Sequence, residues 1–160
     1  EQLVADIMRQ RAPHIALSLS CEVQPEFRDY ERLSTTVLNA YLQPIMSDYL
    51  QTLEDGVSNQ AANASLGINQ SSGGLMSPQR SRELPVRTAL SGPAAGAVGA
   101  AHVARQTDRQ NIITLDVGGT SADVALIRDF EVDIAFDRDV AGFPISRVLR
   151  NKNGFLSCWH

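Results

Sequence analysis

The segment Leu115–Val124 contains the residue types best suited to chemistry in this sequence. Gly118 and Gly119 stand where an apolar stretch ends, and the hydroxyl residues Thr120 and Ser121 follow them. Glycines have no Cβ, so backbone N–H groups in such a turn can approach an anion closely and form a concave anion site. The pattern favours a phosphate-binding turn and an ordinary Gly-Gly β-hairpin equally. It is neither the G-x-x-x-x-G-K-S/T loop, which requires a lysine, nor the G-x-G-x-x-G fingerprint.

Apolar stretches on both sides of the turn predict strands over Asn111–Val117 and Ala122–Ile127, and a third strand is expected over Glu131–Phe136. Asp116 lies near the end of the first strand and Asp123 lies in the second. Mg²⁺ prefers oxygen ligands and keeps several of its waters. We therefore expect Asp116 to hold a divalent cation, through water, beside the glycine turn.

A helix is predicted just before these strands, over Ala94–Arg105. Ser91 is its candidate cap, and Ser91 and Gly92 stand at its N-terminus, which favours anions. Simple capping explains these two residues equally well. Gly96 and Gly99 weaken a helix by about 1 kcal/mol each relative to alanine, so we expect them to allow close approach of a neighbouring element.

The strongest periodic signal predicts a long helix over Thr35–Asp55 with a broad apolar stripe. Ser34 or Thr35 is expected to cap its start, and Gly56 to end it. Pro44 removes one backbone donor inside the pattern, so a kink is expected there. We interpret the stripe as a core-facing surface.

Strands that alternate with helices indicate the α/β class, with an antiparallel hairpin near the end. The other segments are expected from period and turn residues to be a helix over Leu3–Met8 stopped by Pro13, a strand over His14–Ser20, a polar turn over Cys21–Tyr30, a short strand over Leu66–Gln70, a turn over Ser71–Gly74, an exposed connection over Ser77–Glu83 and an extended piece over Val86–Leu90.

Composition places the chain among ordinary globular proteins. The 160 residues suggest about one domain, and 43% hydrophobic with 20% charged residues argues against intrinsic disorder. A net charge of -4 argues against nucleic-acid binding, for which a basic patch is expected, and no apolar stretch is long enough to span a bilayer. Cys21 and Cys158 cannot form a disulfide framework, which fits a reducing cytoplasm.

Four segments in order resemble one family. The sequence LDVGGTSADVALI (Leu115–Ile127) is similar to the second phosphate hairpin of the hydantoinase A and oxoprolinase family. Ser18–Pro44, Asn69–Leu75 and Leu90–Ala104 resemble further motifs of that family, in the same order. Together they span roughly residues 14 to 140, so the resemblance covers most of the chain.

The resemblance implies a partial actin-like ATPase fold, of the ribonuclease H-like type, with ATP and Mg²⁺ as cofactors. Members activate a small cyclic amide or a ketone by phosphoryl transfer, a reaction that relies on positioning and charge neutralisation. A hydantoinase B-type subunit or domain is the implied partner. By this resemblance the phosphate contacts are Gly118, Gly119, Thr120 and Ser121, the metal contact is Asp116, and Asp123 orients the loop or assists a proton transfer. Ser91 and Gly92, at the helix N-terminus, are further candidates for cofactor binding.

The sequence also departs from the family pattern. Cys21 stands where the family has a histidine, in the segment Ser20–Arg32 that the resemblance places on the substrate side. The family has two phosphate hairpins, whereas this chain has one of the D-x-G-G-T type. We therefore expect residues 1–146 to be a fragment of the ATPase domain, and residues 147–160 to be a tail from a truncation or frameshift.

Three functions remain open from the sequence. The first is a fragment of an ATP-dependent hydantoinase or oxoprolinase with little or no ATPase activity alone, because one phosphate lobe is missing. The second is a non-catalytic scaffold for a partner subunit. The third is a subunit of an ATP-dependent ketone carboxylase, since ring-opening and carboxylating members share these motifs.

Overall fold

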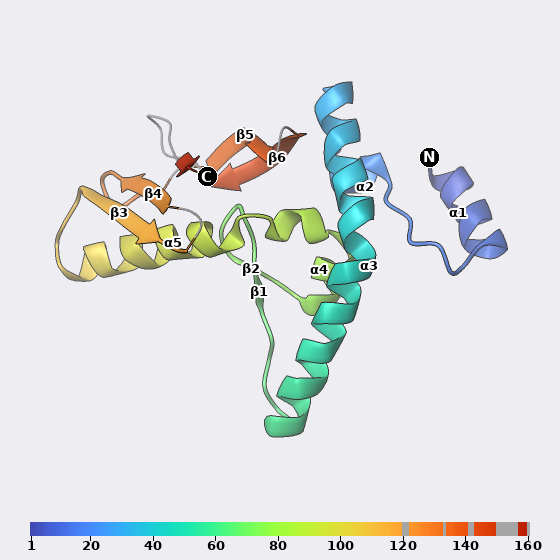
Figure 1. Cartoon of the computed structure of the whole chain (residues 1–160), viewed down its shortest axis with the longest axis horizontal. Helices are drawn as coiled ribbons and strands as arrows, with labels where there is room; N and C mark the ends of the chain where they lie inside the picture. The colour runs from blue at the N-terminus through green and yellow to red at the C-terminus, as the bar shows by residue number, and fades with distance from the viewer. Residues whose placement is uncertain (120–121, 133, 141–142, 150–156, 160) are drawn as a thin grey trace.

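The computed structural model describes residues 1–119, 122–132, 134–140, 143–149 and 157–159. A long helix, α3 (Asp29–Gln60), and a second helix, α5 (Ser91–Gln106), lie crosswise and form the frame of the molecule (Figure 1). The helix α1 (Gln2–Arg11) lies on one side of α3, and the strands near the C-terminus lie beside α5 on the other. Within the described ranges, no helix has the length and apolar character needed to cross a membrane.

The helix α3 is longer than the predicted helix at both ends. Asp29 and Glu31 stand in its first turn, where acidic side chains stabilise the helix dipole. Ser34 and Gly56 therefore lie inside the helix, and the expectation that they cap and end it is wrong. Pro44 lies within the helix, as predicted.

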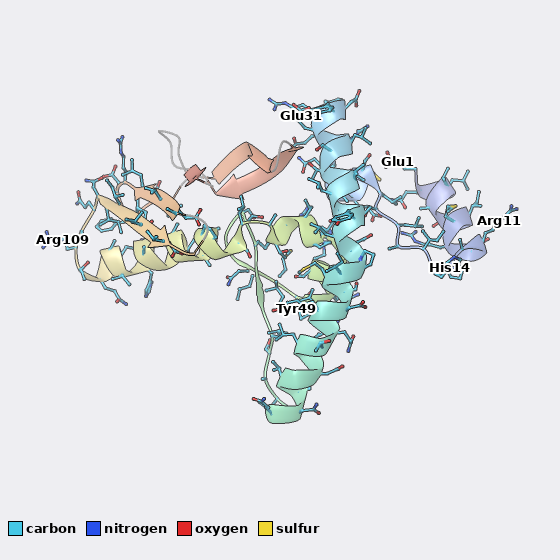
Figure 2. All side chains as sticks on the ribbon, viewed as in Figure 1. Glu1, Arg11, His14, Glu31, Tyr49 and Arg109 are labelled. Atoms are coloured by element: carbon cyan, nitrogen blue, oxygen red, sulfur yellow. The ribbon has the colours of Figure 1, made fainter. Side chains whose placement is uncertain are left out.

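The apolar stripe of α3 is only partly a core surface. Leu50 is 1% exposed, and its neighbours on that side are half-buried. Tyr41 and Tyr49, in contrast, are 69% and 60% exposed, and Figure 2 shows side chains extending outward along much of α3. Our interpretation of the whole stripe as core-facing is therefore wrong for its outer half.

Asn39 joins three parts of the chain from the middle of this buried side. It is fully buried, and its amide nitrogen donates to the Ser18 hydroxyl and to the Glu83 carbonyl, at 2.9 Å each. Its amide oxygen accepts from the Val86 N–H at 3.2 Å. These bonds attach α4 (Pro78–Glu83) and the 3-10 helix η1 (Pro85–Thr88) to α3.

A small hairpin packs beside η1. Its strands are β1 (Ile68–Asn69) and β2 (Leu75–Met76), which pair antiparallel. Gly73 and Gly74 have φ values of 83° and 81° in the turn, a backbone region that glycine adopts easily. The N–H and hydroxyl of Ser71 both donate to the Arg87 carbonyl, at 2.7 and 2.6 Å, and so attach the turn to η1.

The C-terminal strands form two antiparallel sheets. β3 (Ile112–Val117) pairs with β4 (Ala122–Ile127), and β4 pairs with β7 (Ser157–Trp159). β5 (Ile134–Val140) and β6 (Phe143–Leu149) form a separate hairpin. The strands β3 and β4 confirm the predicted hairpin. β7 places residues 157–159 of the tail beside the strand that carries Asp123.

Small residues bring α5 against the β3–β4 hairpin. Its buried residues recur at helical spacing and are all alanines: Ala94, Ala97, Ala101 and Ala104. A Cβ on Gly96 or Gly99 would have no atom within 4 Å, so the predicted close approach at these glycines is wrong. The alanines, rather than the glycines, make the contact.

Three local predictions fail where long-range contacts decide the structure. The segment over residues 14–19 is not a strand, and residues 20–23 form α2 (Ser20–Val23). The expected connection at 77–83 is the helix α4, whose cap Ser77 accepts from the Arg80 N–H and whose Ser81 is fully buried. The expected extended piece at 86–90 begins in η1, where Val86 is 6% exposed in the apolar cluster with Val23.

We predict that Asn39→Leu lowers the free energy of unfolding by about 2–4 kcal/mol, because the buried Val86 N–H loses its acceptor and the Ser18 hydroxyl loses a donor. Urea denaturation followed by circular dichroism measures this. Asn59→Leu, at an exposed position of the same helix, is the control and should change stability by less than about 0.5 kcal/mol. Equal effects of the two substitutions would contradict the role of Asn39.

Candidate functional site

The β3–β4 register places the two aspartates directly opposite each other. Asp116 pairs with Asp123, and Thr114 pairs with Ala125 two positions along. Directly opposed residues of antiparallel strands project from the same face of the sheet, with Cβ atoms about 4.5–5.5 Å apart. The hairpin therefore brings both predicted carboxylates together on one face.

A cleft of about 270 Å³ opens between this face and α5. From the helix, small residues leave the space open, and from the strands the two aspartates and Thr114 face it. The described residues that line the cleft are Pro93, Gly96, Ala97, Ala100, Thr114, Leu115, Asp116, Asp123 and Ala125. Gly96 thus leaves room for the cleft.

The two carboxylates differ in their surroundings. Asp116 is exposed, whereas Asp123 is half-buried and takes part in interactions within the protein. Two like charges at opposed positions of a sheet destabilise it. A cation between them would remove this repulsion, so the arrangement suits a positively charged ligand.

The glycine turn that follows Asp116 is open to solvent. Gly118 and Gly119 are exposed, and a Cβ on Gly119 would have no atom within 4 Å. There is therefore space beside the Gly119 backbone for a ligand. Thr120 and Ser121, the predicted hydroxyl contacts, lie outside the described residues.

Pro93, in the first turn of α5, lines the same cleft, so the N-terminus of this helix lies beside it. The helix begins at Ser91, and the preceding Leu90 has a left-handed conformation with φ of 61°. The N-cap residue is Leu90, and Ser91 is already the first residue of the helix, so the prediction that Ser91 caps it is wrong. Ser91 and Gly92 lie in the first turn, whose N–H groups have no partners within a helix, but neither is among the described residues that line the cleft.

The donor set fits Mg²⁺ bound with most of its own waters. Carboxylate oxygens are suitable ligands, and Mg²⁺ is often held by one or two carboxylates plus phosphate oxygens. Within the described ranges, no group of three or more His, Cys, Asp or Glu side chains is placed to hold a metal. The site can thus contribute two carboxylates, and the other ligands must be water or a bound anion.

Sequence reasoning missed Thr114 and the alanine wall of α5. The Thr114 hydroxyl donates to the Ala125 carbonyl at 3.3 Å and accepts from the Ala125 N–H at 3.2 Å. It lies two residues before Asp116, so strand alternation alone places it on the same face. In α5, the helical spacing of the alanines was the signal that could have predicted its buried face.

The Cys21 thiol lies away from this cleft, beside Glu1. The Glu1 carboxylate accepts from the Ser20 hydroxyl at 2.8 Å and from the Cys21 N–H at 3.0 Å, and Figure 2 shows Glu1 on the side of α1 that faces α2. Hydrogen bonds from the Cys21 side chain, the Ser20 hydroxyl and the Cys21 backbone lower the pKa of Glu1 from 4.5 to about 2. The hydrogen bond to Glu1 raises the pKa of Cys21 above its usual value, which disfavours the reactive thiolate form.

The hairpin, the cleft and the crossing helices define a class of protein, because they form part of an α/β, actin-like ATPase fold. The solved nucleotide-free structure of acetone carboxylase, an enzyme of ATP-dependent acetone carboxylation, matches with a TM-score of 0.75 and 26% identity, over 92% of this chain and 21% of that one. The family model described as Hydantoinase/oxoprolinase matches residues 32–151. The chain belongs to the hydantoinase/oxoprolinase family.

Two relatives align with most of this chain. It is 35% identical to caprolactamase subunit alpha of Pseudomonas jessenii, over 92% of this chain and 22% of that protein. It is 34% identical to 5-oxoprolinase of Saccharomyces cerevisiae, over 91% of this chain and 11% of that protein. The chain thus spans about a fifth of the former's length and about a tenth of the latter's.

We predict that Asp116→Asn, measured in EDTA, stabilises the protein by about 0.2–1 kcal/mol, because it removes one of two opposed charges. In the original protein, millimolar Mg²⁺ should raise the melting temperature, and in Asp116→Asn it should not. Asp108→Asn is the control, since Asp108 is exposed with φ of 53°, which asparagine also adopts. Equal shifts of the melting temperature with Mg²⁺ in Asp116→Asn and in the unsubstituted protein would show that Asp116 does not hold the cation.

Cys21 should react slowly with iodoacetamide, with a pH–rate midpoint above that of a free thiol. Glu1→Gln should shift the midpoint down, because a neutral amide stabilises the protonated thiol less than a carboxylate does. The measurement is the alkylation rate from pH 6 to 11. Asp6→Asn, on the same helix but not bonded to Cys21, should leave the profile unchanged, and an unchanged profile in Glu1→Gln would contradict the assignment.

Proposed function

We propose that the cleft between α5 and the β3–β4 hairpin is a phosphate-binding half-site for Mg·ATP in a hydantoinase or oxoprolinase-type enzyme. The observation that carries this proposal is that the opposed pair Asp116 and Asp123 lines the cleft, with the glycine turn following Asp116 two residues along the chain. The relatives' names and the ATP dependence of acetone carboxylation support it.

In this proposal each group has a distinct task. Asp116, the more exposed carboxylate, holds the cation through water, and Asp123 orients the hairpin or accepts a proton. The N–H groups of Gly118 and Gly119 donate to phosphate oxygens, together with Thr120 and Ser121. The first turn of α5, with Ser91 and Gly92, adds the positive end of its helix dipole. When bound, Mg·ATP supplies a phosphoryl group that makes a carbonyl carbon electrophilic.

The cleft is too small for a whole nucleotide. Its 270 Å³ lies below the roughly 300–1,000 Å³ of typical ligand pockets. We therefore propose that this chain contacts the phosphates and the metal, and that the nucleoside and a second phosphate hairpin require other parts of a longer protein or a partner. Binding by this chain is then weak, and turnover is negligible.

The substrate of the whole enzyme is a small cyclic amide in our first proposal. The names caprolactamase and 5-oxoprolinase indicate cyclic amide substrates, whereas acetone, the substrate in the name acetone carboxylase, is a ketone. A ketone carboxylase subunit is therefore the second candidate. The caprolactamase relative is named as a subunit, which supports a hydantoinase B-type partner for either function. A non-catalytic scaffold is the remaining alternative, and it predicts no response to nucleotide.

We predict that the chain binds Mg·ATP with a dissociation constant near the millimolar range and shows no ATP turnover above background. Isothermal titration calorimetry and a phosphate-release assay measure the two quantities. Asp116→Ala should weaken binding at least tenfold, equivalent to about 1.4 kcal/mol. Turnover that Asp116→Ala abolishes would contradict the half-site, and complete absence of binding would support the scaffold.

A matched pair of glycines tests the phosphate contact. Gly119→Ala and Gly99→Ala both place a methyl group where no atom lies within 4 Å, so neither strains the fold by a clash. Only Gly119 belongs to the turn beside Asp116. Gly119→Ala should weaken Mg·ATP binding several-fold, and Gly99→Ala should leave it unchanged. Equal binding by the two variants would place the phosphates elsewhere.

A further inference from the structure

A row of large apolar side chains along the outer face of α3 remains exposed. Their spacing of three or four residues places them along one side of the helix. We call them the α3 outer row, and its members are Tyr30, Leu33, Val37, Tyr41, Ile45 and Tyr49. Each is between 56% and 69% exposed. Monomeric proteins rarely expose contiguous apolar patches of more than a few hundred Å², so the row indicates a surface that another polypeptide covers.

The exposed area of the row approaches that of a small dimer interface. An aromatic side chain buries roughly 150–250 Å², so the three tyrosines, each exposed by about two thirds, offer roughly 300–500 Å² per copy. The three aliphatic side chains add roughly 100–200 Å². Two copies that join through this row therefore bury roughly 800–1,400 Å² in total, and a specific interface needs about 1,000 Å². The area suits a reversible dimer, and tyrosine is enriched at such interfaces.

The order of side chains along the row is symmetric about the level of residue 39. Val37 and Tyr41 each lie two positions from that level, and Leu33 and Ile45 each lie six positions from it. At 1.5 Å per residue, these separations are about 3 and 9 Å along the helix axis. An antiparallel second copy therefore places Val37 against its Tyr41, and Leu33 against its Ile45. Such a two-fold interface uses the same surface on both copies.

Asp48 determines which way the two helices run. Of the charged residues between Tyr30 and Tyr49, which are Glu31, Arg32 and Asp48, only Asp48 is exposed. It lies 18 residues after Tyr30, a separation of five helical turns, so the two share one side of α3. In a parallel pair in register, two Asp48 carboxylates would meet and repel each other. In the antiparallel pair, the Asp48 carboxylate meets the Tyr30 phenol of the second copy, which donates a hydrogen bond to it.

We propose that the α3 outer row binds the same row of a second copy of this chain, with the two helices antiparallel. No member of the row is among the described residues that line the α5 cleft. The proposal therefore concerns assembly, and it is independent of the proposed phosphate site.

Sedimentation velocity of the 160-residue chain, without nucleotide or Mg²⁺, measures the assembly. The average mass should rise from one copy toward two as the concentration increases through the micromolar range. Val37→Lys should raise the dissociation constant of the dimer at least about tenfold, because it places two like charges near the centre of the interface. Val103→Lys on α5 is the matched control, since Val37 and Val103 are each 56% exposed, and it should dimerise like the original protein. Circular dichroism checks that both variants keep their helices.

Cysteine cross-linking tests the orientation, in a chain whose Cys21 and Cys158 are replaced by serine. Chains with Leu33→Cys and chains with Ile45→Cys are mixed and oxidised, and the antiparallel pair predicts disulfides between the two different chains. A disulfide requires Cα atoms within roughly 7 Å of each other. Leu33→Cys mixed with Ser58→Cys is the control, because Ser58 is exposed on α3 but lies outside the row, and this mixture should not form the mixed disulfide.

Three results would overturn the proposal. A chain that stays monomeric at every concentration leaves the row to be covered by another part of a longer protein. Equal dissociation constants for Val37→Lys and Val103→Lys place the interface elsewhere. Leu33→Cys chains that link only to each other show that the helices are parallel. Because these measurements use neither nucleotide nor Mg²⁺, none of the three results bears on the α5 cleft.

Discussion

The three hydrogen bonds of Asn39 hold the helical frame together. Among the described residues apolar burial around this point is modest, because the cluster beside it has three buried side chains, Val23, Leu84 and Val86. Apolar contacts of that size do not fix a register, whereas a buried amide must meet its partners with defined geometry. Asn39 therefore fixes α4 and η1 on α3, together with Gln43, whose amide also donates to the Glu83 carbonyl at 3.0 Å. The helix α5 follows η1 along the chain.

The same small residues of α5 that allow packing also create the cleft. Ala97 and Ala101 are buried at 2% and 3% exposure, so the helix approaches the β3–β4 hairpin closely. Gly96, one residue from Ala97, has open space where a side chain would lie, and it lines the cleft. A larger residue at either kind of position would push the hairpin away or fill the opening. The helix propensity lost at Gly96 is thus offset by the opening that this glycine leaves for the cleft.

Sequence patterns predicted the elements whose structure is local, and they failed where distant residues decide. The strands Ile112–Val117 and Ala122–Ile127 and the opposed aspartates follow from alternation around a glycine turn. Asn39 gave no such signal, because its partners lie 44 and 47 residues along the chain. The burial of Gln24 could not be predicted either, since only tertiary structure decides that a polar residue is buried. On the outer face of α3, apolar side chains that were predicted to be buried are exposed, because periodicity shows which side chains share a face and not what covers that face.

The candidate site in the α5 cleft coincides with a local departure from a stability optimum. Opposed aspartates repel each other in a sheet. A chain shaped for stability alone would carry a neutral pair at 116 and 123. Such departures concentrate at functional positions, where a ligand supplies the missing interaction.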